Sequence, residues 1–243
     1  MANLGVVFSV KLFELTSSIS IMKMLAEQAE KNVLLAVTAA DEPDAVKEGE
    51  FDAEAYDENG ESYPCTQTYY SCGSSIGYDY DEVKLEYKSL ISSLTRRSAF
   101  LTMFGLFEHR INGCLEEMIS LSGFSGDLKC KGSIEKSHVI LKKGFEARHI
   151  VDIDHLTVIR NIMIHNDGLA TDYHKTACKT EKKTEFEKRL LKAVKRADGV
   201  DVNPFNGLIV DERFLPYAVN EFNRYATELE EAIQSYHRQN PQP

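Results

Sequence analysis

The sequence predicts an all-α fold, an antiparallel helical bundle with one long loop insertion and a minor β-hairpin. Two observations predict it. Apolar side chains recur at helical intervals over most of the chain, and residues 39–77 have no such periodicity. The expected helices cover residues 10–37, 81–122, 133–145, 154–165, 185–194 and 216–236.

The first expected helix, residues 10–37, has apolar side chains at helical intervals from Leu12 to Ala29. The region 39–77 that follows is rich in acidic residues, glycine, serine and tyrosine, and Asn59-Gly60 is a turn signal. We expect a loop there. Its tyrosine rings should fold back onto the body, because aromatic rings are costly to leave in water.

The helix expected over residues 81–122 has a broad apolar face, and Gly123 is suited to cap its carboxyl end. A shorter helix follows over residues 133–145. Ser133 is its expected N-cap, because a serine hydroxyl can accept a hydrogen bond from the first turn.

The next helix, residues 154–165, closes at the Asn-Asp-Gly sequence of residues 166–168. Another helix covers residues 185–194. Residues 200–214 contain turn signals and a short apolar run, which predicts a short strand or hairpin. The last helix, residues 216–236, again has apolar side chains at helical spacing.

The length of 243 residues is within what a single large helical fold with an insertion can occupy. We expect residues 1–79 to form an amino-terminal helix plus the acidic, tyrosine-rich insertion. Residues 80–238 should form the helical domain, packed as one unit, and residues 239–243 a frayed tail.

The formal net charge is −10, from 38 acidic and 28 basic side chains. Such a field repels a polyanion and argues against a general nucleic-acid coating role. Much of the acid lies between Asp41 and Asp57, so a local basic site for RNA elsewhere in the chain stays open.

The cysteines are irregularly spaced and include no C-x-x-C pair: Cys65, Cys72, Cys114, Cys130 and Cys178. This argues against a disulfide framework and a zinc ribbon, and favours a reducing compartment. The apolar stretch of residues 4–10 is too short for a signal peptide or a membrane span. We therefore expect a cytoplasmic protein.

Arg160 and His165 lie near the carboxyl end of the helix expected over residues 154–165, and Asn161 directly follows the arginine. A guanidinium offers a donor fork suited to phosphate, and an imidazole exchanges protons near neutral pH. Phosphodiester chemistry needs both. Five positions along a regular helix set the two side chains about 140° apart. They converge on one ligand only where the helix unwinds at His165, which the terminator at residues 166–168 favours.

At these residues the sequence resembles the HEPN superfamily. Its hallmark is an arginine followed four to six residues later by a histidine, at the end of a helix in an all-helical bundle. Here the motif is Arg160, Asn161 and His165. Residues 98–108 look like the long helix that precedes the motif in bacterial members. The resemblance covers residues 80–236 and implies a HEPN-like antiparallel helical bundle.

The resemblance implies a metal-independent endoribonuclease of toxin-antitoxin or antiphage systems, working as a dimer whose two motifs meet. Attack of a ribose 2′-OH on the adjacent phosphate needs a base, an acid and cations. One His165 cannot fill both proton roles in a concerted step, whereas two copies across a symmetric dimer can. Arg160 would hold the phosphate, and Asn161 would orient it. Glu108 and Asp167 are supporting candidates, Glu108 as a residue that positions Arg160.

The expected partners are an RNA substrate, a second copy of the chain and an antitoxin protein, with no metal and no cofactor. Three alternatives stay open. Arg160 could pair with a nearby carboxylate, such as that of Asp154 or Asp167, while His165 caps a helix end. The chain could be a non-catalytic HEPN-like interaction or scaffold module. It could also be a toxin silenced by nucleotidylation or by a partner.

Overall fold

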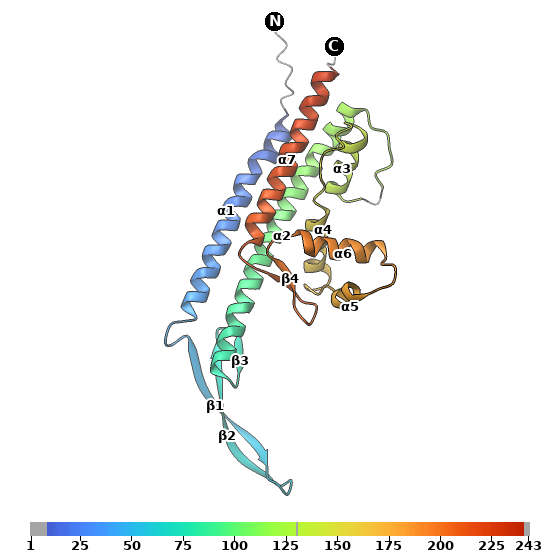
Figure 1. Cartoon of the computed structure of the whole chain (residues 1–243). Coiled ribbons are helices and arrows are strands. Elements are labelled where there is room, and N and C mark those ends of the chain that lie inside the picture. The colour runs from blue at the N-terminus through green and yellow to red at the C-terminus, as the bar shows by residue number, and fades with distance from the viewer. Residues whose placement is uncertain (1–8, 130, 241–243) are drawn as a thin grey trace. The chain divides into compact units, whose positions relative to one another are not determined.

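The structure, a computed structural model, describes residues 9–129 and 131–240 (Figure 1). Its helices are α1 (Val10–Ala39), α2 (Tyr80–Ser122), α3 (Ser133–Lys143), α4 (Asp154–His165), α5 (Tyr173–Cys178), α6 (Glu185–Arg196) and α7 (Phe214–Gln239). Its strands are β1 (Val46–Tyr56), β2 (Ser62–Cys72), β3 (Ser75–Gly77), β4 (Val200–Val202) and β5 (Leu208–Val210). The prediction of a mainly helical protein is confirmed.

The described chain forms two compact units. The first unit contains the described residues up to Glu27 and those from Arg97 onward, and the second unit is Gln28–Arg96. Both boundaries fall inside long helices, so α1 and α2 each contribute to both units.

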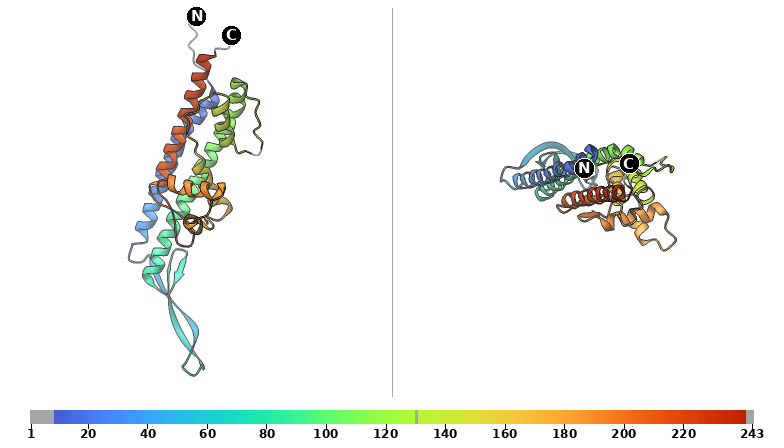
Figure 2. Two further views of the ribbon diagram at one scale, coloured as in Figure 1. Left: turned by 45° about the vertical axis from the view of Figure 1, so that its right-hand side comes forward. Right: turned by 90° about the horizontal axis from the view of Figure 1, so that it is seen from above.

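The core of the first unit is aromatic. Its largest fully buried side chains come from α2 and α7: Phe100, Phe104, Phe107, Phe214, Phe222 and Tyr225. Phe107 and Phe222 stack with ring centroids 4.5 Å apart, and Phe100 lies 4.7 Å from Phe214. Each such burial contributes about 1.5–3 kcal/mol. In Figures 1 and 2 the amino-terminal part of α1 runs beside these two helices, where Glu14 pairs with Arg110 of α2.

A second cluster of the first unit joins α4, α6 and the β4–β5 hairpin, with Val158, Ile162, Leu190, Val194 and Val202 among its buried members. The hairpin is antiparallel, as predicted for residues 200–214. It also binds the segment that follows α4, because Leu208 N–H donates to Gly168 O and Ala170 N–H donates to Asn206 O, each at 2.8 Å.

Two expectations about the helices need correction. The N-cap of α3 is Gly132, and the hydroxyl of Ser133 instead donates to Asn112 Oδ1 at 3.1 Å. The short helix α5 was not predicted, because six residues are too few to show a helical period. The left-handed backbone of Gly123, φ +61°, agrees with the predicted end of α2.

The prediction of a long loop over residues 39–77 is wrong. β1 and β2 form an antiparallel hairpin whose register runs without a break from Val46↔Cys72 to Tyr56↔Ser62. β3 pairs with the last residues of β2. The predicted Asn59-Gly60 turn is present: Gly60 has φ +84°, and Asp57 Oδ1 accepts hydrogen bonds from the N–H groups of Asn59 and Glu61.

The tyrosines of this region are only partly buried. Tyr70 and Tyr87 pack against the small core of the second unit, made of Ala40, Val46, Cys72 and Val83. Tyr63 and Tyr78 remain 50% and 70% exposed, so the expectation that the rings fold back is wrong for these two.

Some predictions fall outside the described residues. They concern Cys130, residues 4–8 of the apolar amino-terminal stretch and residues 241–243 of the tail. The four described cysteines are not in disulfide bonds. Among the helices of residues 9–129 and 131–240, none has the length and apolar character needed to cross a membrane.

Candidate functional site

Two hydrogen bonds and one aromatic ring orient the guanidinium of Arg160. Its Nη2 donates to Glu108 Oε2 of α2 at 2.7 Å, and its Nη1 donates to Asn161 Oδ1 at 2.9 Å. The guanidinium carbon lies 4.9 Å from the centroid of the Phe104 ring. Three of the sequence-predicted residues, Arg160, Asn161 and Glu108, are therefore in direct contact.

The local sequence of α2 explains this arrangement. Phe104 and Glu108 are four residues apart, so they share one face of the helix and offer an aromatic ring and a carboxylate to the same cation. The Arg160 side chain keeps 21% of its surface exposed. An arginine has five N–H donors, and two of them are used here, so others remain for an anion.

His165 is the last residue of α4 and is exposed. The predicted unwinding at His165 is wrong, because α4 stays helical through this residue. The chain turns only at Asp167, with φ 50°, where the N–H groups of Asn166 and Gly168 both donate to Ile162 O. Regular helix geometry therefore leaves Arg160 and His165 about 140° apart. Arg160 and His165, both in the described part of the chain, share no hydrogen bond.

Asp167 pairs with an arginine that the sequence analysis missed. Arg97 of α2 donates to Asp167 Oδ1 at 3.2 Å and also to the backbone oxygen of Met163. A cation at this position is favourable, because the carboxyl end of a helix is partly negative. The alternative in which Arg160 pairs with a nearby carboxylate agrees with the structure, but the partner is Glu108. Of the two partners named for it, Asp167 pairs with Arg97, and Asp154 pairs with Arg189 at 2.6 Å.

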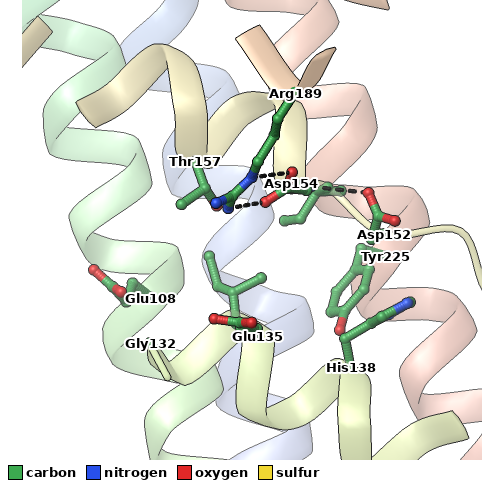
Figure 3. Close-up of a pocket in the computed structure, with 11 residues that line it drawn as sticks. Glu108, Gly132, Glu135, His138, Asp152, Asp154, Thr157, Arg189 and Tyr225 are labelled. Atoms are coloured by element: carbon green, nitrogen blue, oxygen red, sulfur yellow. Dashed lines mark hydrogen bonds and ion pairs between the residues drawn. The ribbon is translucent and has the colours of Figure 1, made fainter. Parts of the chain in front are cut away.

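Glu108 also lines a cavity of about 310 Å³ between α2, α3, α4, α6 and α7 (Figure 3). Its ionisable lining is Glu108, Glu135, His138, Asp152, Asp154, Arg189 and Tyr225. Every carboxylate among them has a basic partner: Glu108 pairs with Arg160, Glu135 with Lys131, Asp154 with Arg189, and Asp152 with Arg196 at 3.6 Å. The cavity thus has little unbalanced charge.

The surroundings of the cavity histidine favour its uncharged form. Both ring nitrogens of His138 are buried without a hydrogen-bond partner among the described residues. Burial, followed by the nearby charge of Lys142, lowers its pKa below 6.5. The described residues contain no group of three or more histidine, cysteine or acidic side chains that could hold a metal ion.

A second buried histidine, His155 of α4, lies in a polar network. Its Nε2 is 2.9 Å from the hydroxyl of Tyr217, which itself donates to Arg196 O. Because the hydroxyl proton is donated to Arg196 O, we assign Nε2 as the donor to the tyrosine oxygen. Nδ1 is then a buried acceptor with no hydrogen-bond partner in the described part of the chain. Burial lowers the pKa of His155 to about 4. The residue holds α4 against α7 in its neutral form.

Exposed apolar side chains lie near His165. Ile164 precedes it and is 49% exposed, and Leu169 follows it and is 48% exposed. The β4–β5 hairpin, which is hydrogen-bonded to residues 168–170, adds Phe205 and Ile209, 85% and 48% exposed. We call these four residues the apolar patch. Large exposed apolar patches are typical of interaction sites.

Comparison of the chain with protein-family models, curated proteins and solved structures found no match.

Proposed function

We propose that this protein is a metal-independent endoribonuclease that works as a symmetric dimer, with Arg160 and His165 as its catalytic residues. The observation that carries the proposal is the setting of Arg160. Glu108, Asn161 and Phe104 orient its guanidinium while part of it stays exposed and keeps donors for a phosphate.

The proposed reaction is an internal transesterification. The imidazole of one His165 takes the proton from a ribose 2′-OH, whose oxygen forms a bond to the adjacent phosphorus. The bond from phosphorus to the 5′-oxygen breaks, and the second copy's His165, protonated, gives its proton to that oxygen. The products are a 2′,3′-cyclic phosphate and a 5′-hydroxyl. Arg160 binds the phosphate oxygens that gain negative charge.

A second copy is needed because one His165 cannot act as base and as acid in one concerted step. Arg160 and His165 of one chain lie about 140° apart on a regular helix, so the proposal also requires the last turn of α4 to open when RNA binds. The apolar patch includes Ile164 and Leu169, which lie on either side of His165 in the sequence, and it supports dimer contact there, which would bring the two copies of His165 to one seam.

The test is cleavage of total RNA and tRNA by the purified full chain in EDTA. We expect wild type to cut and His165→Ala and Arg160→Ala to lose at least about a hundredfold in rate. The matched control is His109→Ala, an exposed histidine of α2 outside the site, which should cut like wild type. Equal cutting by wild type and His165→Ala, or no cutting by wild type, would contradict the proposal.

A second candidate function is a non-catalytic interaction module, and one observation favours it. The charge of Arg160 is already balanced by Glu108, as in a purely structural ion pair that joins α4 to α2. A protein of this kind would bind a protein partner through the apolar patch and leave RNA intact. Growth arrest on expression that disappears in Arg160→Ala would argue for the nuclease, and an antitoxin would then be the partner to seek.

A further inference from the structure

The β1–β2 hairpin has two chemically different faces, which follow from its register. Glu48, Glu50, Asp52 and Glu54 alternate along β1 and therefore lie on one face. The β2 residues paired with them are uncharged: Tyr70, Thr68, Thr66 and Pro64. We call the four carboxylates the acidic row. All four are exposed, and none has an ion-pair partner among the described residues.

The other face of the hairpin is apolar and aromatic. Along β1 it carries Gly49, Phe51, Ala53 and Ala55, and along β2 it carries Tyr63, Cys65, Gln67 and Tyr69. Phe51 and Tyr63 are 39% and 50% exposed. In Figures 1 and 2 no other element of the second unit covers the distal part of this ribbon. A two-stranded hairpin alone is marginally stable, so an uncovered apolar face of this kind gains stability from a partner.

β1 also has an open edge. The strand order is β1-β2-β3, so β1 pairs only with β2 over its eleven residues. Natural proteins usually protect such an edge with charged side chains, lysine above all, or with proline or a bulge. The acidic row gives β1 this protection only against strands that are not basic. The register of β1 has no bulge and the strand has no proline, and its one lysine, Lys47, lies at the start. The outward backbone groups of β1 are therefore available to another strand.

The acidic row determines which kind of strand can pair with the open edge of β1. A second copy of β1 would set carboxylates opposite carboxylates, and like charges directly opposite each other destabilise a strand pair. Nucleic acid is repelled by the same charges, because the hairpin carries seven carboxylates (Glu48, Glu50, Asp52, Glu54, Asp57, Glu58 and Glu61) and a single lysine. A strand with basic side chains on one face and apolar ones on the other complements both faces.

We propose that the edge of β1 binds an extended segment of another protein in which lysine or arginine alternates with apolar residues. The segment adds a strand to the hairpin. Its basic side chains face the acidic row, because both strands repeat every two residues, and its apolar side chains lie beside Phe51 and Ala53. The inference is independent of the nuclease proposal, since it uses no residue of that site.

The test uses the full chain and a synthetic peptide of about nine residues that alternates lysine and valine. Binding is measured by fluorescence anisotropy. Hydrogen exchange reports whether the outward amides of β1 gain protection. We expect the double variant Glu50→Lys/Asp52→Lys to bind at least about tenfold more weakly than wild type. The matched control, Glu58→Lys/Glu61→Lys, changes the net charge equally in the turn and should bind within about threefold of wild type.

Two further peptides separate strand pairing from simple charge attraction. One has the same composition with all lysines grouped at one end, and the other has N-methyl groups on the amides that would face β1. Both should bind at least about tenfold more weakly than the alternating peptide. Equal binding of the three peptides, equal loss in both double variants, or a dimer in solution that the Glu50→Lys/Asp52→Lys variant disrupts would overturn the proposal.

Discussion

Glu108 of α2 accepts a hydrogen bond from the guanidinium of Arg160 of α4 at 2.7 Å, although the two residues are 52 positions apart in the chain. The pair joins two helices of the first unit, and Glu108 itself lines the cavity in Figure 3. It orients the arginine of the proposed site and holds α4 against α2 at the same time.

We expect Glu108→Gln to lower the free energy of unfolding by about 1 kcal/mol, because it removes a charge-assisted hydrogen bond from a partly exposed pair. Urea denaturation measures the change. The control is Glu116→Gln, an exposed α2 residue with no ion-pair partner within residues 9–129 and 131–240, which should stay within about 0.5 kcal/mol of wild type. Equal stability of the two variants would show that the ion pair does not hold α4.

The end of α4 depends on left-handed backbone at Gly168, with φ +79°. Gly168→Ala should cost about 1–2 kcal/mol, because an alanine is strained in this conformation, whereas the new methyl group would meet only Arg97 Nη1 at 3.5 Å. Thermal unfolding followed by circular dichroism measures the loss.

Gly105 provides the opposite case for comparison. It lies inside α2, is exposed, and has open space where a side chain would begin. Gly105→Ala should therefore stabilise the protein by about 0.5–1 kcal/mol. A loss of stability in both variants would mean that the effect at residue 168 does not come from backbone conformation.

His155 should make the protein less stable in mild acid. Its pKa is about 4 in the folded chain, against an ordinary value of 6.5. Between these pH values the unfolded chain binds a proton that the folded chain does not, so stability falls as pH decreases from 6.5 to about 4. The loss is on the order of 3 kcal/mol.

The variant His155→Gln isolates this effect. Glutamine can still donate to the hydroxyl of Tyr217 but does not titrate. We expect a smaller loss of stability than in wild type over the same pH range, measured by urea denaturation at each pH. Equal losses in the two proteins would show that His155 is not the responsible group.

The helices were predictable because each one shows its own period and end signals in the sequence. The expected helix over residues 154–165 has the same bounds as α4, since apolar spacing and the Asn-Asp-Gly terminator agree there. α1, α2 and α7 differ from expectation by at most three residues at either end. Local signals of this kind predict the helix bounds correctly where tertiary contacts favour the same conformation.

The β1–β2 hairpin was missed although its signal is present. Residues 48–55 alternate acidic and small or apolar side chains, and Asn59-Gly60 follows within a few residues. The acidic residues, alanine and glycine of β1 have low strand propensity and hid this period of two. In the candidate site, Arg97 and Arg189 were missed for another reason, because their partners are 70 and 35 residues away.

Gly49 and Tyr69 lie opposite each other in the hairpin, and a methyl group on Gly49 would be 2.5 Å from Cζ of the tyrosine ring. The ring occupies the space that any side chain at position 49 would need. A side chain at position 49 would therefore require the end of the Tyr69 ring to move or a smaller residue in its place. In any natural variant of this hairpin, we expect a larger residue at position 49 to be accompanied by a smaller one at position 69.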